Sequence, residues 1–208
     1  MITGTILKAA VIGNLELNND STTETRFRVY ANINAALRTV LRTFPLSQID
    51  NAIKTATFNL LQDISAYQWP ADFVRFVRMW VDYSTAMSQT NHGNEATPAW
   101  ESQFYGNSLD QRPLATAPRV DIVEGGFDIR PVPASALANG GRLKYVYLQP
   151  DISDSQNCLL REDLYNAIVF EGTSLCMKID GYNIKGSIDY HDRFKDELVI
   201  FGGSNVDV

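Results

Sequence analysis

The chain has 208 residues, of which 45% are hydrophobic and 20% are charged, and its formal net charge is −6. This balance is ordinary for a folded globular protein and argues against wholesale disorder. The acidic charge argues against a protein that coats nucleic acid, because phosphate binding needs clustered Lys and Arg. It remains compatible with a surface that faces DNA without gripping it.

The sequence also gives little support for a membrane protein or a secreted protein. No run approaches about 18 consecutive apolar residues, so we expect no membrane span. The N-terminal stretch has neither the basic region nor the A-x-A-like cleavage site of a signal peptide. Two cysteines, Cys158 and Cys176, give no disulfide framework. We expect both to be packing residues in a reducing compartment.

The N-terminal part has the period of helices. Residues Thr5 to Asn14 carry an apolar stripe typical of a short amphipathic helix, and Leu15 to Asp20 form a polar link. Ser21 and Glu24 have the spacing of a capping box. A long helix is then predicted from Glu24 to Phe44, with Pro45 stopping it. Its apolar positions recur every three or four residues: Phe27, Tyr30, Ile33, Leu37, Val40, Leu41 and Phe44.

Arginines mark this helix. Arg38 and Arg42 lie one turn apart, and Arg26 and Arg28 lie near its start. One interpretation is an ordinary solvated basic face. The other is a contact surface for an acidic partner or a neighbouring subunit.

The period then changes to that of strands. Residues Asn51 to Gln62 predict a strand, and Asp63 to Ala66 a turn. In Tyr67 to Asp82, Trp69-Pro70 sets a second turn because proline restricts itself and the residue before it. From Phe73 onward both faces are largely apolar, which is typical of a strand buried on two sides. We expect it to be the antiparallel partner of the strand before it.

The rest of this β region is less regular. Ser84 to Pro118 lacks strong periodicity, which is typical of a functional or mobile segment, and Ala99 to Gly106 within it could form a short helix. Arg119 to Arg130 predicts a hairpin with Gly125-Gly126 at its tip. A loop is predicted for Ala134 to Gly141 and a strand for Arg142 to Gln149.

Helical periodicity returns after Pro150. One stripe runs from Leu160 to Ile179 and on to Tyr182, and Gly181 suggests its end. A last helix is predicted from the stripe Ile184, Ile188, His191, Phe194 or Lys195, and Leu198. The predicted fold class is therefore α+β. Residues 1–50 and 151–200 form a discontinuous helical bundle, 51–150 an inserted antiparallel β domain, and 201–208 a flexible tail.

The sequence shows no pattern of catalytic or metal-binding residues. H-x-x-x-H, HExxH and CxxC spacings are absent, which makes a zinc site improbable. There is no G-x-S-x-G, and Gly172-Thr173-Ser174 falls inside a predicted helix, where a nucleophile elbow cannot form. No Lys-Ser or Lys-Thr follows the glycine pairs, as a phosphate loop would require. We predict no catalytic, metal or cofactor site.

The acidic side chains have structural explanations. Glu162-Asp163 falls at a helix start, where negative charge suits the helix dipole. Asp72 follows Pro70 and is expected to satisfy local backbone donors rather than to serve as a catalytic acid. Glu95 and Glu101 could form a glycosidase-like pair, but only their presence supports it.

The order of motifs resembles the tail tubular protein A type of head-to-tail adaptor from short-tailed bacteriophages. Residues 5–45 are similar to that family's short helix, polar link and long helix. The motif Tyr67, Trp69, Pro70, Asp72, Phe73 and Arg75 resembles its "LPxDFLR" strand start, although Trp69 stands where an aliphatic residue is usual. Residues 127–133 and 143–150 resemble two later strands, and 160–179 its C-terminal helix. Residues 84–118 match no pattern of the family.

The resemblance implies a structural role in the virion. Such adaptors are non-enzymatic subunits of a ring, commonly dodecameric, that attaches to the portal protein and extends the DNA channel. The ring offers a platform for a downstream tail or nozzle protein. The implied location is the neck or tail of the virion, after assembly in the host cytoplasm. A ring interface is heterologous and closes by rotation. An acidic protein can line a channel through which DNA passes without sequence-specific binding.

Within this hypothesis the residues take assembly roles. Arg38 and Arg42 are expected to face a neighbouring subunit or the portal. The C-terminal residues Leu198, Val199, Ile200 and Phe201 are expected to order on the portal by adding a strand to an exposed edge. The residues Pro70, Asp72, Phe73 and Arg75 are expected to form a structural motif.

Two other functions remain open. One is a tail-associated carbohydrate-binding module that uses Trp100, Phe104 and Tyr105 as stacking platforms. The other is an adaptor that carries a cell-wall hydrolase.

Overall fold

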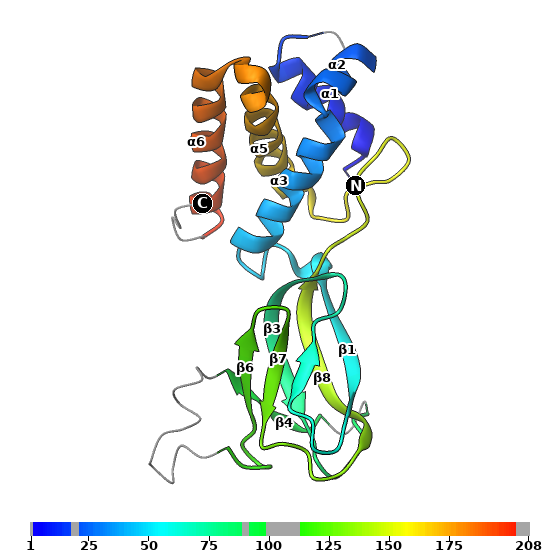
Figure 1. The fold of residues 1–208 in the computed structure, drawn as a ribbon. Helices are drawn as coiled ribbons and strands as arrows, with labels where there is room; N and C mark the ends of the chain where they lie inside the picture. Colours follow the sequence, from blue (N-terminus) through cyan, green and yellow to red (C-terminus); the bar gives the residue numbers. More distant parts are fainter. Residues whose placement is uncertain (1, 18–20, 89–91, 99–112, 203–208) are drawn as a thin grey trace. The chain divides into compact units, whose positions relative to one another are not determined.

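The computed structural model describes residues 2–17, 21–88, 92–98 and 113–202. The fold is α+β, as predicted, and has two compact units (Figure 1). The helical unit consists of Met1–Ile53 and Tyr147–Val208, and the β unit is Lys54–Val146. Among the described residues, no helix is long and apolar enough to cross a membrane.

The helical unit is built around one central helix. It contains α1 (Gly4–Asn14), α2 (Ser21–Phe27), α3 (Val29–Thr43), α5 (Tyr165–Lys178) and α6 (Ile184–Ile200). Helix α5 packs against α1, α3 and α6. Helices α3 and α6 flank α5 and run in the same direction, opposite to that of α5 (Figure 1). Short 3-10 segments lie at Asp50–Ala52, Glu162–Leu164 and Ile179–Gly181.

The long helix predicted from Glu24 to Phe44 is in fact two helices. Arg28 separates α2 from α3 in a left-handed conformation, with φ 46° and ψ 46°. The break leaves the carbonyl of Phe27 outside regular helical pairing. The Asn32 side chain donates to that carbonyl over 2.8 Å, and the Cys176 thiol lies 3.6 Å from it. These side-chain contacts stabilise a break that apolar periodicity alone does not reveal.

The β unit contains two four-stranded sheets, with strand orders β1-β8-β3-β4 and β2-β7-β6-β5. The first four strands are β1 (Ile53–Leu60), β2 (Ala66–Gln68), β3 (Phe73–Val81) and β4 (Asn94–Glu95). The others are β5 (Thr97–Pro98), β6 (Arg119–Val123), β7 (Gly126–Arg130) and β8 (Leu137–Tyr147).

The strands predicted within 51–62, 73–82, 119–130 and 142–149 are present, whereas one strand pairing and one loop were predicted wrongly. The 119–130 hairpin is confirmed as β6 and β7, with Gly125 at φ 79° in the turn, and 73–81 is a strand. The expected pairing of β1 with β3 is wrong, because β8 lies between them. The expected loop from Ala134 to Gly141 is wrong in its second half, because β8 begins at Leu137.

Burial along β3 also differs from the prediction. Met79 and Val81 are fully buried, whereas residues 73–77 are half-buried and Arg78 is exposed. The strand is therefore part of the core at its end and lies partly at the surface at its start. Strand β2, which no sequence signal predicted, pairs with β7 from Ala66 to Gln68.

The C-terminal helices differ from the prediction in where α5 begins and in which side of α6 is buried. Helix α5 starts at Tyr165, not Leu160, and Cys158, which lies before it, forms a β-bridge with Ile2. Helix α6 exists as predicted, but Ile184 and Ile188 are exposed. The side of α6 that is buried carries Ser187, Phe194 and Leu198.

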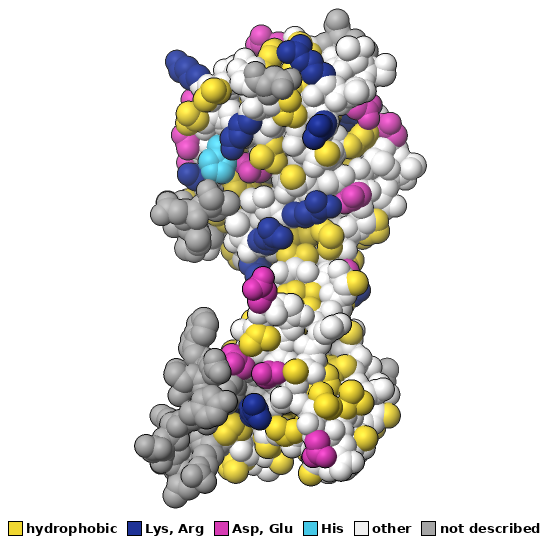
Figure 2. Space-filling model, viewed as in Figure 1, with side chains coloured by type: hydrophobic (Ala, Val, Ile, Leu, Met, Phe, Trp, Pro, Cys, Tyr) yellow, Lys and Arg dark blue, Asp and Glu magenta, His cyan; other side chains and the backbone are white. Residues whose placement is uncertain are grey.

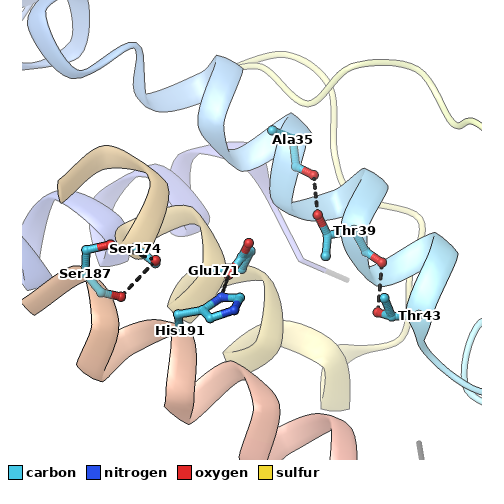
Figure 3. A network of polar contacts seen from close by, with 7 residues as sticks. All are labelled: Ala35, Thr39, Thr43, Glu171, Ser174, Ser187 and His191. Atoms are coloured by element: carbon cyan, nitrogen blue, oxygen red, sulfur yellow. Dashed lines mark hydrogen bonds and ion pairs between the residues drawn. The ribbon is translucent and has the colours of Figure 1, made fainter. Parts of the chain in front are cut away.

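A polar contact explains this rotation of α6. The Ser174 hydroxyl donates to the Ser187 backbone carbonyl over 2.9 Å, and the two hydroxyls lie 3.2 Å apart (Figure 3). Small side chains at this point let α5 and α6 approach closely, which places Ser187 inside and turns Ile184 and Ile188 outward.

Candidate assembly surfaces

The outer side of α3 carries the two arginines predicted to make contacts. Ala31, Arg38 and Arg42 are exposed and Ala35 is half-buried, and together these four residues form one line along the helix. The opposite side is fully buried through Ile33, Ala36, Leu37, Val40 and Leu41. The buried side anchors the helix, so the arginines project from a firmly held surface. Figure 2 shows several Lys and Arg side chains spread over the helical unit on the face in view.

Arg38 pairs with a carboxylate of its own chain. Its Nη2 lies 3.1 Å from Oδ1 of Asp151, with exposed side-chain fractions of 44% and 65%. The neighbouring residue Ile152 is held by buried Asn34, whose amide donates to the Ile152 carbonyl over 3.1 Å and accepts from its N–H over 2.7 Å. Asn34 thereby helps to position Asp151 beside Arg38. An ion pair this exposed contributes little to stability and can exchange partners.

The four C-terminal residues predicted as a contact segment differ in their exposure to solvent. Leu198 is fully buried, while Val199 and Ile200 are exposed at 50% and 74%. Phe201 lies with its ring centroid 5.9 Å from that of Phe44. Leu198 to Ile200 are the last turn of α6, so in this structure they are helical and not an extended strand. Most of the predicted flexible tail, residues 203–208, lies outside the described residues.

Sequence reasoning missed the exposed side of α6. Its i, i+4 row contains Ile184, Ile188, Asp192, Asp196 and Ile200, all of them exposed. The apolar members looked like core residues because they repeat at helical spacing. The predicted stripe is buried at Phe194 and Leu198, whereas nearer the start of the helix Ser187 is buried and Ile184 and Ile188 are exposed.

The motif around Pro70 ties three neighbouring strands together. Asp72 accepts a hydrogen bond from the Tyr145 hydroxyl of β8 over 2.9 Å and forms an ion pair with Lys54 of β1. The N–H of Phe73 donates to the Pro70 carbonyl over 2.9 Å, and the Phe73 ring stacks on Trp69 with 4.0 Å between centroids. Strands β1, β8 and β3 are adjacent in the sheet, so the motif links them across its surface.

The electrostatics of this motif fit a structural carboxylate. Burial by itself would raise the pKa of Asp72, but hydrogen bonds from Lys54 and Tyr145 outweigh it, and the pKa lies below its ordinary value. The hydrogen bond to Asp72 raises the pKa of Lys54. Burial lowers the pKa of the half-buried Arg75. Asp72 bonds to side chains of other strands rather than chiefly to the local backbone.

The interior of the helical unit holds a polar pair without the geometry of a catalytic site. His191 Nδ1 lies 2.8 Å from Glu171 Oε2, and the two side chains are 18% and 6% exposed (Figure 3). Ser174 bonds Ser187, as described above, and Gly172-Thr173-Ser174 lies inside α5 as predicted. On α3, the hydroxyls of Thr39 and Thr43 donate to backbone carbonyls one turn earlier, so both hydroxyls bond within their own helix.

The cysteines, the possible metal ligands and the Glu95–Glu101 pair were the other candidates for chemistry. Cys158 and Cys176 are buried, and burial raises the pKa of Cys176 to about 11, which keeps its thiol protonated. In the part of the chain that the structure describes, no group of three or more His, Cys, Asp or Glu could hold a metal ion. Glu95 pairs with Arg78 over 3.6 Å. Glu101 and the aromatic residues Trp100, Phe104 and Tyr105 lie outside the described residues.

The described part of the β unit contains an apolar hollow of about 120 Å³. Its walls come from β1, β2, β7 and β8, and include Phe58, Tyr67 and Phe127. These three rings contact one another, with centroids 5.4 to 5.5 Å apart. The hollow is the space beside this aromatic cluster, and no charged side chain lines it.

Comparison with known protein families identifies the family of this chain. The model of the SU10 adaptor protein family matches residues 3–174, which span both units. The chain belongs to this family of phage adaptor proteins, and membership implies a structural, non-enzymatic component of the virion. No curated protein matches the chain significantly. The end of α5, all of α6 and everything after it lie beyond the matched residues.

Proposed function

We propose that this protein is a head-to-tail connector subunit of the tail tubular protein A type. Copies form a ring, a dodecamer, that attaches to the phage portal protein. The ring extends the channel through which genomic DNA passes and provides a platform for a downstream tail or nozzle protein. The subunits assemble in the host cytoplasm and remain in the neck of the virion.

The observation that carries this proposal is the adaptor-family match across both units, joined to the exposed face of α3. A firmly packed helix that presents Arg38 and Arg42 outward suits contact with an acidic neighbour. The net charge of −6 supports the channel role, because like charge repels DNA phosphate and lets DNA slide past.

Charge reversal on α3 tests the proposal. The double variant Arg38→Glu and Arg42→Glu is expected to lose capture by the immobilised portal protein, or formation of the ring, at moderate salt. The matched control is Arg161→Glu with Lys178→Glu, which changes the net charge equally. Arg161 suits this purpose because its side chain is also 44% exposed and pairs with a carboxylate, Asp163, at 2.7 Å.

Three results are informative. Loss in the α3 variant with retention in the control supports the role of this face. Equal retention in both removes Arg38 and Arg42 from assembly. A wild-type chain that fails to bind the portal at all contradicts the connector function itself.

A further inference from the structure

Helix α6 presents an unusual outer ridge. Ile184 and Ile188 are 63% and 56% exposed, and Asp192 and Asp196 follow in the same i, i+4 row. Rows of this kind form the ridges that pack into grooves of another helix. Among the described residues, neither aspartate makes an ion pair within 4.0 Å. The ridge thus reads apolar, apolar, acidic, acidic along the chain.

The outer line of α3 has the complementary order. Ala31 and Ala35 come first and offer a low, apolar surface, and Arg38 and Arg42 follow. The two alanines are four residues apart, as are Ile184 and Ile188. The two arginines are four residues apart, as are Asp192 and Asp196. Each four-residue step is about 6 Å along a helix. The step between the two halves is three residues in α3, from Ala35 to Arg38, and four in α6, from Ile188 to Asp192, so the two patterns agree to within about 1.5 Å.

We propose that α6 of one copy packs in parallel on α3 of the next copy. Ile184 and Ile188 cover Ala31 and Ala35, and the two aspartates pair with the two arginines. This inference rests on the ring of the proposed function. It identifies the contact between neighbouring copies of the ring, which we call the seam. Burying the exposed isoleucines supplies apolar contact, and the charge pairs set the register along the helices.

The helical unit has the geometry that such a seam needs. Helices α3 and α6 lie on different sides of α5 and run in the same direction (Figure 1). A rotation about an axis roughly parallel to these helices preserves their direction, so parallel packing repeats from copy to copy. Because the two surfaces differ, the contact is heterologous, and a rotation that closes produces a ring.

The existing ion pair of Arg38 does not oppose this contact. Its partner Asp151 is 65% exposed, and an exposed pair is weak and adjustable. The guanidinium presents several donors and can bridge Asp151 and a carboxylate of the next copy. In such an arrangement Asp151 holds Arg38 in position before association.

Disulfide cross-linking tests the contact directly. One chain carries Ala35→Cys and another carries Ile188→Cys, and the native Cys158 and Cys176 are buried. Mild oxidation of the mixture is expected to give a cross-linked heterodimer on a non-reducing gel. The control mixture pairs Ile188→Cys with Ile6→Cys, because Ile6, on α1, is 52% exposed and so is more accessible than the half-buried Ala35 that it replaces. Cross-linking no greater than in this control overturns the proposal.

A charge swap tests the register. The first variant is Arg38→Glu with Arg42→Glu, and the second is Asp192→Arg with Asp196→Arg. Each alone is expected to associate at least tenfold more weakly than the wild type by sedimentation, since like charges then face each other. Mixed together they should associate again, because every contact in an alternating assembly has opposite charges. Failure of the mixture to associate, with both variants folded by circular dichroism, overturns the pairing.

These outcomes separate the seam from the connector function. Cross-linked copies that the portal protein does not capture would support the seam and contradict the function. Portal capture without the 35–188 cross-link would support the function and overturn the seam.

Discussion

Replacing Asn34 tests how α3 is held in place. The buried side chain pairs with both the N–H and the carbonyl of Ile152, at 2.7 and 3.1 Å, and Ile152 itself is 1% exposed. In Asn34→Ala both backbone groups lose their partner in a site shielded from water. An unsatisfied buried polar group costs about 1–3 kcal/mol, so the two together predict a loss of about 2–6 kcal/mol.

The assay is urea unfolding followed by circular dichroism at a helix-sensitive wavelength, which reports mainly on the helical unit. The matched control is Asn166→Ala. Asn166 is exposed, and its side-chain amide donates a long hydrogen bond of 3.4 Å to Glu197. The control is expected to change the free energy of unfolding by no more than about 0.5 kcal/mol. If Asn34→Ala lowers the free energy of unfolding no more than this control, the two hydrogen bonds between Asn34 and Ile152 do not stabilise the fold.

Three further predictions concern other parts of the chain. The pKa of Asp72 is lower in the folded protein than its ordinary 3.8, so its stabilising effect is present at neutral pH and is lost as the pH falls below about 4. Asp72→Asn should therefore be less stable than wild type at pH 7, by at most about 1 kcal/mol, and equal to it near pH 2; a constant difference across this range would contradict the assignment. Because burial raises the pKa of Cys176 to about 11, iodoacetamide at pH 8 should label the folded chain far more slowly than the unfolded chain, and equal rates would show that the thiol is accessible. Arg28 has φ 46°, so Arg28→Gly should be at least as stable as wild type, whereas Arg28→Val should lose about 1–3 kcal/mol in thermal unfolding; equal losses would exclude a conformational cause.

Local patterns in the sequence were sufficient for most of the elements. The apolar repeat along α3 and the turn glycine between β6 and β7 each report a local preference, and both elements are present. The break at Arg28 is different. It depends on Asn32 and on Cys176, which comes from a helix far along the chain. A window centred on Arg28 contains no sign of that distant partner.

Strand order and helix rotation could not be predicted for the same physical reason. Placing β8 between β1 and β3 depends on long-range pairing, and alternation within a strand does not say which strand lies beside it. In α6 either Ser187 or the isoleucines Ile184 and Ile188 could face the core at the start of the helix, and the structure buries Ser187. Contact between Ser174 and Ser187 favours one of them, and only the packed structure shows it.

The candidate surfaces were predicted in part. Arg38 and Arg42 lie at the surface, as a basic helix face should, but their role in assembly stays a prediction. The Pro70 motif is a structural link through Asp72, although its partners Lys54 and Tyr145 come from strands whose proximity the sequence did not indicate. Leu198 was assigned to a contact segment and is instead part of the core, because it lies on the buried side of α6.

We propose that copies of this chain form a ring on a portal protein. Mass measurement of the intact chain, alone and mixed with the cognate portal, tests it most directly. We expect a complex whose added mass equals a closed ring of copies, a dodecamer, and whose formation fails for Arg38→Glu with Arg42→Glu. A chain that stays monomeric and adds no mass to the portal would contradict it.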